Sequence, residues 1–163
     1  MIIGLARLAA AAAALAAVTL SSQAGAPAPG GLVGGLAGRW AGPGEALFKD
    51  GGHTAFKCVV VYLTDKAGSQ VRQTVRCESD RLDLNLENDW KVQDGSISGT
   101  WRETKYELHG SLLGSLDPEG YNLYGENEFG SATISVRTST CEQDVVMKFS
   151  KEVDLLTAKL KKC

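Results

Sequence analysis

The sequence contains few of the residues from which metal sites are usually built. Only two histidines, His53 and His109, occur among the 163 residues, and they lie far apart in the chain. No pair of histidines stands at helical spacing beside a glutamate, and the four cysteines form no Cys-x-x-Cys pair. These absences exclude the usual zinc motifs. We therefore expect neither a metal site nor a cofactor.

A nucleophile with a neighbouring base is also missing. Residues 95–99 (GSISG) match the letters of a Gly-x-Ser-x-Gly elbow, but that elbow needs a strand followed by a helix. A strand pattern follows here instead. We therefore predict that the protein is not an enzyme and has no catalytic residues.

Neither sign of charge is concentrated in one part of the chain. The sequence contains seventeen Lys and Arg residues and nineteen Asp and Glu residues, which gives a net charge of -2. The longest run of like-charged residues is the Lys161-Lys162 pair. A nucleic-acid surface needs a clustered basic face. The composition therefore argues against nucleic acid as a partner.

The N-terminal segment has the three parts of a secretory signal peptide: Arg7, an apolar run over residues 8–20, and the small residues Ala24-Gly25-Ala26. The apolar run is 13 residues long, short of the roughly 20 that a membrane-spanning helix needs. We predict a signal peptide over 1–26, a flexible Gly- and Pro-rich leader over 27–38 and a folded domain over 39–163. The mature protein would be periplasmic or secreted, with no stable membrane span after signal cleavage.

From residue 39 onward, apolar and polar residues alternate in short runs. Between residues 82 and 92, Leu82, Leu84, Leu86, Trp90 and Val92 all fall on even positions, and this period of two predicts a strand. Turn residues interrupt such runs at nearly regular spacing, which indicates about eight to ten antiparallel strands. Because closure removes the exposed edges of a large sheet, we predict an all-β, antiparallel up-and-down barrel. A two-sheet β-sandwich is the alternative.

Two turns fix the pairing of neighbouring strands. Asp94-Gly95 is typical of a type I′ hairpin and would place Val92 opposite Ile97 and Trp90 opposite Gly99. Residues 117–120 (DPEG) predict a second turn, in which the glycine is free to adopt a left-handed conformation.

The four cysteines of an exported chain predict two disulfides. Opposed residues of a hairpin have position numbers with a constant sum, and pairing Cys58 with Cys77 centres a hairpin on the turn residues 65–69. Pairing Cys141 with Cys163 centres another on Glu152, within the polar residues 150–154. We predict this connectivity, provided that no bulge shifts either pair of strands.

Several segments carry a resemblance to a known family: residues 36–44 (LAGRWAGPG), 57–62 (KCVVVY), 75–77 (VRC) and 95–103 (GSISGTWRE). They resemble a functionally uncharacterised family of small secreted bacterial proteins that look lipocalin-like. The Gly-x-Trp start is similar to that of lipocalins and implies that Trp40 plugs the barrel bottom. Secreted barrel inhibitors of metalloproteases share this start and an early disulfide, and their inhibitory trunk would correspond to residues 27–36.

Two hypotheses of function follow. In the first, the barrel binds a small apolar or amphipathic ligand, because the inner face is expected to carry tryptophan, tyrosine and aliphatic residues. In the second, a barrel with a filled core acts through its surface on an envelope protein partner, as a protease or lysozyme inhibitor or as a structural protein. The expected ligand-lining residues are Phe56, Val60, Tyr62, Leu84, Trp90, Trp101 and Ile134.

Overall fold

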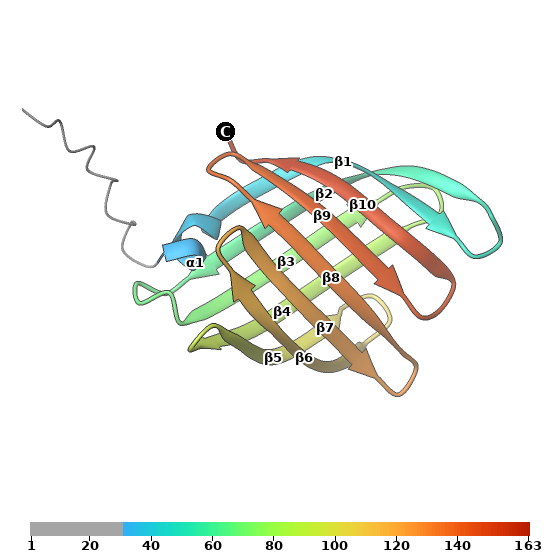
Figure 1. The fold of residues 1–163 in the computed structure, drawn as a ribbon. Coiled ribbons are helices and arrows are strands. Elements are labelled where there is room, and N and C mark those ends of the chain that lie inside the picture. Colours follow the sequence, from blue (N-terminus) through green and yellow to red (C-terminus); the bar gives the residue numbers. More distant parts are fainter. Residues whose placement is uncertain (1–30) are drawn as a thin grey trace, which may run out of the picture.

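The computed structural model describes residues 31–163, which form one short helix and ten strands (Figure 1). The elements are α1 (Gly31–Leu36), β1 (Gly38–Phe48), β2 (His53–Thr64), β3 (Gln70–Glu78), β4 (Asp83–Gln93), β5 (Ser96–Glu103), β6 (Leu108–Asp117), β7 (Gly120–Asn127), β8 (Gly130–Thr138), β9 (Glu142–Phe149) and β10 (Val153–Lys161).

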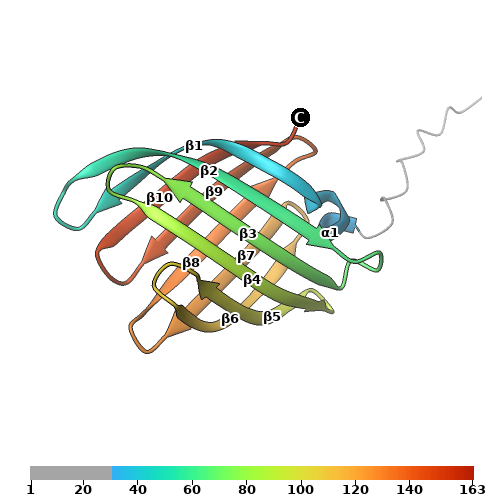
Figure 2. The ribbon, with the colours of Figure 1, turned by 180° about the vertical axis from the view of Figure 1, so that it is seen from behind.

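Each strand pairs antiparallel with the next along the chain, and β1 pairs with β10 to close the barrel (Figures 1 and 2). This confirms the predicted all-β, up-and-down barrel and rules out the β-sandwich. Closure leaves no unpaired edge strand among the ten, which is its physical advantage. The fold is therefore a lipocalin-like barrel of ten strands.

The period of two is visible in the burial of β4. Trp90 and Asn88 point into the barrel, while Glu87 and Asp89 point to solvent. On the outer face, charged residues stand opposite residues of the other sign, as in the Arg72–Asp89 pair at 3.0 Å between β3 and β4. Exposed pairs of this kind favour the register, although each contributes little to stability.

The Asp94-Gly95 hairpin forms as predicted. Both residues have positive φ, 50° and 77°, as a type I′ turn requires, and Val92 lies opposite Ile97. The turn at residues 117–120 also joins the expected strands, but Gly120 does not adopt a positive φ. A Cβ at Gly120 would instead collide with the carbonyl oxygen of Val136, so glycine is needed there for close approach of β8.

Both disulfides connect the predicted cysteines. Cys58 and Cys77 lie directly opposite each other on β2 and β3, as the constant sum required. The second hairpin differs by one residue: Glu142 pairs with Lys161, so that Cys141 faces Lys162 rather than Cys163. Cys163 lies beyond the end of β10 and still bridges to Cys141, with 5.2 Å between the Cα atoms. The predicted register of this hairpin was therefore wrong, although its disulfide was right.

One end of the barrel is covered by α1. Its own residues Val33 and Leu36 are buried, and the indole of Trp40 donates to the Leu36 carbonyl at 2.7 Å. From Gly31 onward, the segment expected to be a flexible leader is thus helical and packed. The predicted signal peptide and residues 27–30 lie outside the described residues. Trp40 is fully buried at this end of the barrel, where the resemblance had placed a plug.

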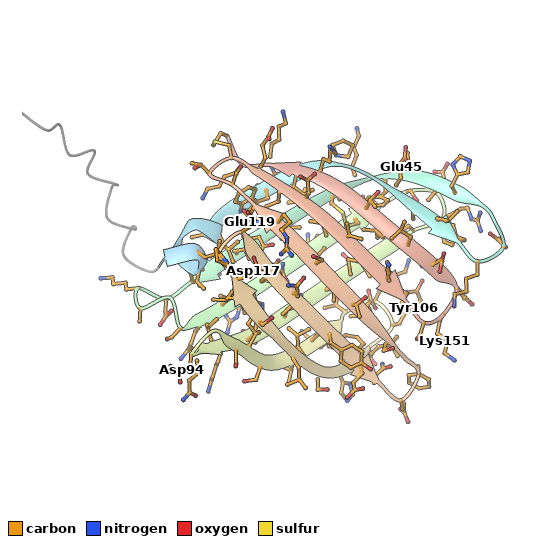
Figure 3. The ribbon with its side chains drawn as sticks, in the orientation of Figure 1. Glu45, Asp94, Tyr106, Asp117, Glu119 and Lys151 are labelled. Atoms are coloured by element: carbon orange, nitrogen blue, oxygen red, sulfur yellow. A yellow bond between two sulfur atoms is a disulfide. The ribbon has the colours of Figure 1, made fainter. Side chains whose placement is uncertain are left out.

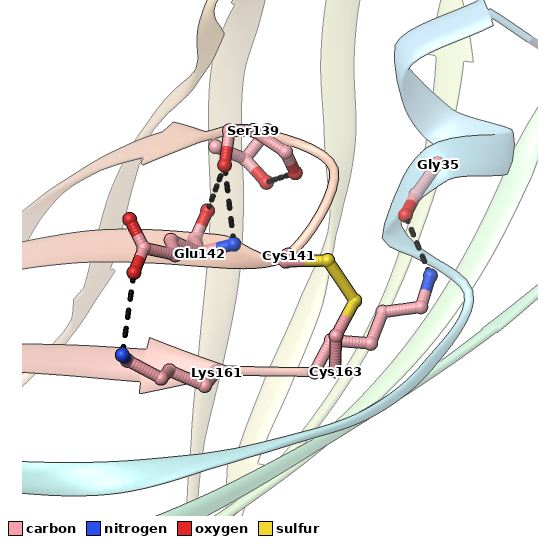
Figure 4. The surroundings of a disulfide bond; sticks show 8 residues. Gly35, Ser139, Cys141, Glu142, Lys161 and Cys163 are labelled. Carbon is pink, nitrogen blue, oxygen red and sulfur yellow. Dashed lines mark hydrogen bonds and ion pairs between the residues drawn. A yellow bond between two sulfur atoms is a disulfide. The ribbon is translucent and has the colours of Figure 1, made fainter.

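The C-terminal residues fasten α1 to the barrel (Figure 4). The ammonium of Lys162 donates to the Gly35 carbonyl at 3.1 Å and lies 5.3 Å from the Trp40 ring centroid. The Cys141–Cys163 disulfide holds the adjacent residue, Cys163, to the start of β9. We call this end, with α1 and the turns that contain Asp94 and Glu119, the closed end (Figure 3).

Two disulfides indicate folding in an oxidising environment, because thiols are kept reduced in the cytosol of most organisms. In the part of the chain that is described, no helix has the length and apolarity needed to cross a membrane.

Candidate ligand-binding cavity

A cavity of about 540 Å³ lies inside the barrel. Its volume falls within the range of roughly 300–1,000 Å³ that is usual for small-molecule sites. The walls are mostly apolar and come from β2 to β10. Their apolar side chains include Val60, Val75, Leu84, Leu86, Leu112, Leu123, Ala132, Ile134, Met147, Phe149, Leu156 and Ala158.

The cavity extends to the end of the barrel opposite α1, which we call the mouth. Phe129 from the β7–β8 turn lines it there, as do Lys151 and Glu152 from the β9–β10 turn. Figure 3 shows Lys151 at this end. Phe129 is 58% exposed, and the Lys151 side chain lies close to Gly130 across the two turns. The cavity therefore reaches the surface of the protein at the mouth.

Five buried polar side chains form one hydrogen-bonded chain towards the closed end. Asn88 Nδ2 donates to Gln73 Oε1 at 2.6 Å, and Gln73 Nε2 donates to the Tyr121 hydroxyl at 3.2 Å. The hydroxyls of Tyr121 and Tyr62 are 2.6 Å apart, and the Tyr62 hydroxyl donates to Gln143 Oε1 at 3.4 Å. With the Tyr62 proton directed to Gln143, Tyr121 donates to Tyr62 in this arrangement. The network gives an apolar cavity a polar floor.

Both tyrosines of the floor are held in the neutral form. Burial raises the pKa of the Tyr62 hydroxyl, and burial together with the neighbouring Tyr62 raises the pKa of Tyr121 well above its ordinary value. A phenolate here would lose its hydration and gain no cation in return. The floor therefore offers hydrogen bonds but no charge.

Two buried polar atoms of cavity-lining residues have no hydrogen-bond partner. They are Asn88 Oδ1 and Trp101 Nε1, and the two residues lie directly opposite each other on β4 and β5. Trp90 Nε1 and Gln143 Nε2 also lack partners, but neither residue lines the cavity. A buried polar atom without a partner is costly, so each such atom calls for an explanation.

Glu103 is a buried acid of the cavity wall. Its side chain is 5% exposed, and its two oxygens accept the backbone N–H groups of Asn85 at 3.2 Å and Tyr106 at 2.6 Å. These bonds tie β5 to β4 and to the turn before β6. Glu103 therefore has a structural role in the wall.

The indole of Trp101 lies across β6 and β7, where the sequence has glycine on the inner face. A Cβ at Gly110 would lie 2.7 Å from Trp101 Nε1, and a Cβ at Gly125 would lie 3.3 Å from it. The two glycines thus leave room for the ring to lie flat against the wall. A larger residue at either position would push the indole into the cavity.

Five of the seven side chains expected to line a ligand site do line the cavity: Val60, Tyr62, Leu84, Trp101 and Ile134. Phe56 is buried but lies against Gly44 of the β1 wall, outside the cavity lining. Trp90 is also outside it, packed 5.4 Å from the Tyr121 ring in the filled half of the barrel. Whether the five contact a ligand stays a prediction.

Sequence reasoning missed the polar floor. Asn88 occupies an even position within the inward series 82–92, and Gln73 lies between Val71 and Val75 on the inward face of β3. A polar residue that interrupts a regular apolar face was the available signal. Reading the same period beyond Trp101 would also have placed Glu103 inside.

The fold and the cavity together define a lipocalin-like barrel with an interior site. No family model matches the sequence, and no curated protein matches it. The crystal structure of Rv2717c from M. tuberculosis is similar, with a TM-score of 0.63 and 14% identity, over 85% of this chain and 99% of that chain. The S-type phycobiliprotein lyase CPES from Guillardia theta has a TM-score of 0.54 and 8% identity, over 80% and 88% of the two chains. At these identities the similarity shows the fold alone.

Proposed function

We propose that the protein binds a small apolar or amphipathic ligand inside its barrel, in the periplasm or outside the cell. The observation that carries this proposal is the cavity of about 540 Å³, with apolar walls, a polar floor and a mouth at one end. A barrel that acted only as a filled scaffold would pack this space with side chains.

The setting outside the cytoplasm rests on three observations: the signal-peptide pattern of residues 1–26, the resemblance to small secreted bacterial proteins, and the two disulfides. We also propose that the protein belongs to that family of small secreted, lipocalin-like proteins.

We also propose that the protein is not an enzyme. CPES is named a lyase, so a protein of similar fold carries an activity. The cavity wall of this chain supports a different role, because its amides and tyrosines bond to one another and Glu103 bonds to backbone. No lining side chain is activated by a neighbouring base, as nucleophilic catalysis requires.

Binding of the neutral fluorescent probe N-phenylnaphthylamine tests the proposal. Ala132 is a small residue of the wall near the mouth, and Ala132→Trp fills the cavity from β8. We expect this variant to lower the affinity for the probe by at least about tenfold, because a bulky ring occupies its site. The control is Thr100→Trp, which adds the same ring to an exposed position on the outer face of β5.

An apolar hollow on the outside of the barrel could also hold the probe. It lies on the outer face of β6 to β9 and exposes Leu113, Tyr124 and Val146. If Tyr124→Ser lowered probe binding while Ala132→Trp left it unchanged, the binding site would be outside the barrel and the proposal would be wrong. Native mass spectrometry of protein isolated from the periplasm gives an independent check, since a bound ligand is lost as mass on denaturation.

A further inference from the structure

Resting on the proposed function, we infer that the ligand is an amphiphile with one ionised head group and an apolar tail, and that it binds tail first. The tail fills the interior of the barrel, and the head group stays at the mouth, in contact with water. The cavity therefore accepts one charged end of a ligand and excludes a second.

The charged groups of the cavity wall are confined to the mouth end of the barrel. Among the described residues that line the cavity, the charged ones are Glu103, Lys151 and Glu152. Lys151 and Glu152 belong to the β9–β10 turn at the mouth (Figure 3). Glu103 is the last residue of β5, a strand that begins at the closed end after the turn containing Asp94, so it lies at the opposite end.

The buried acid of this set already has partners within the wall. Glu103 is 5% exposed, and its two oxygens accept the backbone N–H groups of Asn85 and Tyr106. These bonds join β5 to β4 and to the turn before β6. The charged side chains that are exposed to an incoming head group are therefore Lys151 and Glu152, both at the mouth.

The interior of the cavity is unsuited to an ionised group. From the mouth inward, the wall is mostly apolar and ends at the polar floor, whose amides and hydroxyls bond to one another. Burial raises the pKa of Tyr62 and of Tyr121, so the floor is uncharged as well. An ionised head group at this depth would be buried without an opposite charge, which is strongly unfavourable.

The mouth, in contrast, can receive an ionised head group without removing it from water. The side chains of Lys151 and Glu152 are exposed there and have opposite charges, so a head group of either sign has an attractive neighbour. Transfer of the tail from water to the apolar wall then supplies most of the binding free energy.

Two pairs of ligands with equal chains and different numbers of ionised ends test the direction of binding. They are decanoate with decanedioate, and decyltrimethylammonium with decamethonium, each competing with N-phenylnaphthylamine at pH 8. We expect each single-headed ligand to displace the probe. Each two-headed ligand should bind at least about thirtyfold more weakly than its partner, because its second charge is buried among apolar side chains.

A ligand that bound head first would give a different result. Its tail would lie at the mouth, where a second charge stays in water and costs little. A difference smaller than about thirtyfold in either pair would therefore overturn the inference. Failure of both single-headed ligands to displace the probe would overturn it as well.

A change of charge at the mouth locates the head group. In Lys151→Glu, decanoate should bind about two- to fivefold more weakly and decyltrimethylammonium about two- to fivefold more tightly, as expected for exposed charges. Added salt should reduce both effects. The matched control is Lys66→Glu, the same change at an exposed lysine of the β2–β3 turn, which lies at the closed end beside the start of β1. The control should change neither affinity. Unchanged affinities in Lys151→Glu, or equal changes in the two variants, would contradict a head group at the mouth.

The proposed function and the direction of binding fail in different ways. If Ala132→Trp blocks the probe but single-headed and two-headed ligands bind alike, the barrel binds ligands and the inferred direction is wrong. If Ala132→Trp leaves probe binding unchanged, the proposed function itself is wrong. The comparison of ligands uses the wild-type protein, so it does not depend on the folding of any variant.

Discussion

Removing the Cys58–Cys77 disulfide should destabilise the folded protein by about 3 kcal/mol. The bond closes a loop with a sequence separation of 19 between strands that are already paired. For a closed loop of roughly 20 residues, the loop-entropy relation gives about 11 cal/mol/K, or about 3.3 kcal/mol at 25 °C. The mechanism is a gain in the entropy of the unfolded chain, so native packing need not change.

The perturbation is Cys58→Ala combined with Cys77→Ala. Both side chains line the cavity, so truncating them enlarges an existing space instead of creating a new void. We therefore expect the loop term to dominate over lost packing. Urea unfolding followed by tryptophan fluorescence measures the free energy of unfolding, with the slope against urea reported as well.

The matched control is Cys141→Ala with Cys163→Ala, whose separation of 22 gives nearly the same loop entropy. Its loss should be somewhat smaller, because Lys162 and Cys163 lie beyond β10 and gain freedom in the folded state once released. A loss below about 1 kcal/mol for the Cys58–Cys77 pair would refute the reasoning from loop entropy.

Three further outcomes are expected. Mild dithiothreitol should reduce the Cys141–Cys163 disulfide first, because Cys163 is exposed whereas Cys58 and Cys77 are 4% and 1% exposed. Alkylation followed by peptide mass mapping would show the order of reduction, and simultaneous reduction of both disulfides would contradict this prediction. Gly120→Ala should cost about 1–3 kcal/mol in thermal or urea unfolding because its Cβ meets the Val136 carbonyl, whereas Gly35→Ala has open space and should not destabilise. Above about pH 10, the free energy of unfolding should fall as pH rises. The reason is that the pKa values of Tyr62 and Tyr121 are higher in the folded protein than in the unfolded chain, so unfolding releases protons. Each tyrosine contributes a slope of up to about 1.4 kcal/mol per pH unit. Absorbance of phenolate at alkaline pH should then show these two tyrosines ionising together with unfolding, and a Tyr62→Phe, Tyr121→Phe protein should have a shallower slope.

The topology could be predicted because its signals are local. The period of two around residues 82–92 and the Asp94-Gly95 turn fix a hairpin without any knowledge of the rest of the chain. The pairing of Cys58 with Cys77 was likewise predicted from one constant sum. Closure followed from counting strands and from the instability of open edges.

The errors arose where a terminus departs from the regular pattern. At the C-terminus, Cys163 lies after β10 ends, so the constant sum no longer applies to it. At the N-terminal side, the composition of residues 27–38 suggested flexibility, yet Gly31–Leu36 form α1, which buries Val33 and Leu36 and bonds to Trp40 and Lys162. Burial of a few side chains outweighs the low helix propensity of the surrounding glycines.

The cavity itself depends on side-chain sizes along the barrel axis, which strand periodicity alone does not reveal. The diameter of a barrel grows with the number of strands, and ten strands enclose more space than the eight whose interior side chains can fill. At the closed end, Trp40, Tyr62, Trp90 and Tyr121 are large enough to fill that space. Towards the mouth, Gly125 and Ala132 are neighbours on β7 and β8, and Ala158 is a third small residue on the inner face. Four large aromatic residues therefore fill the closed end, whereas small residues among the aliphatic ones leave space in the rest of the barrel. This uneven distribution of inward side-chain size is a feature that a sequence can be searched for.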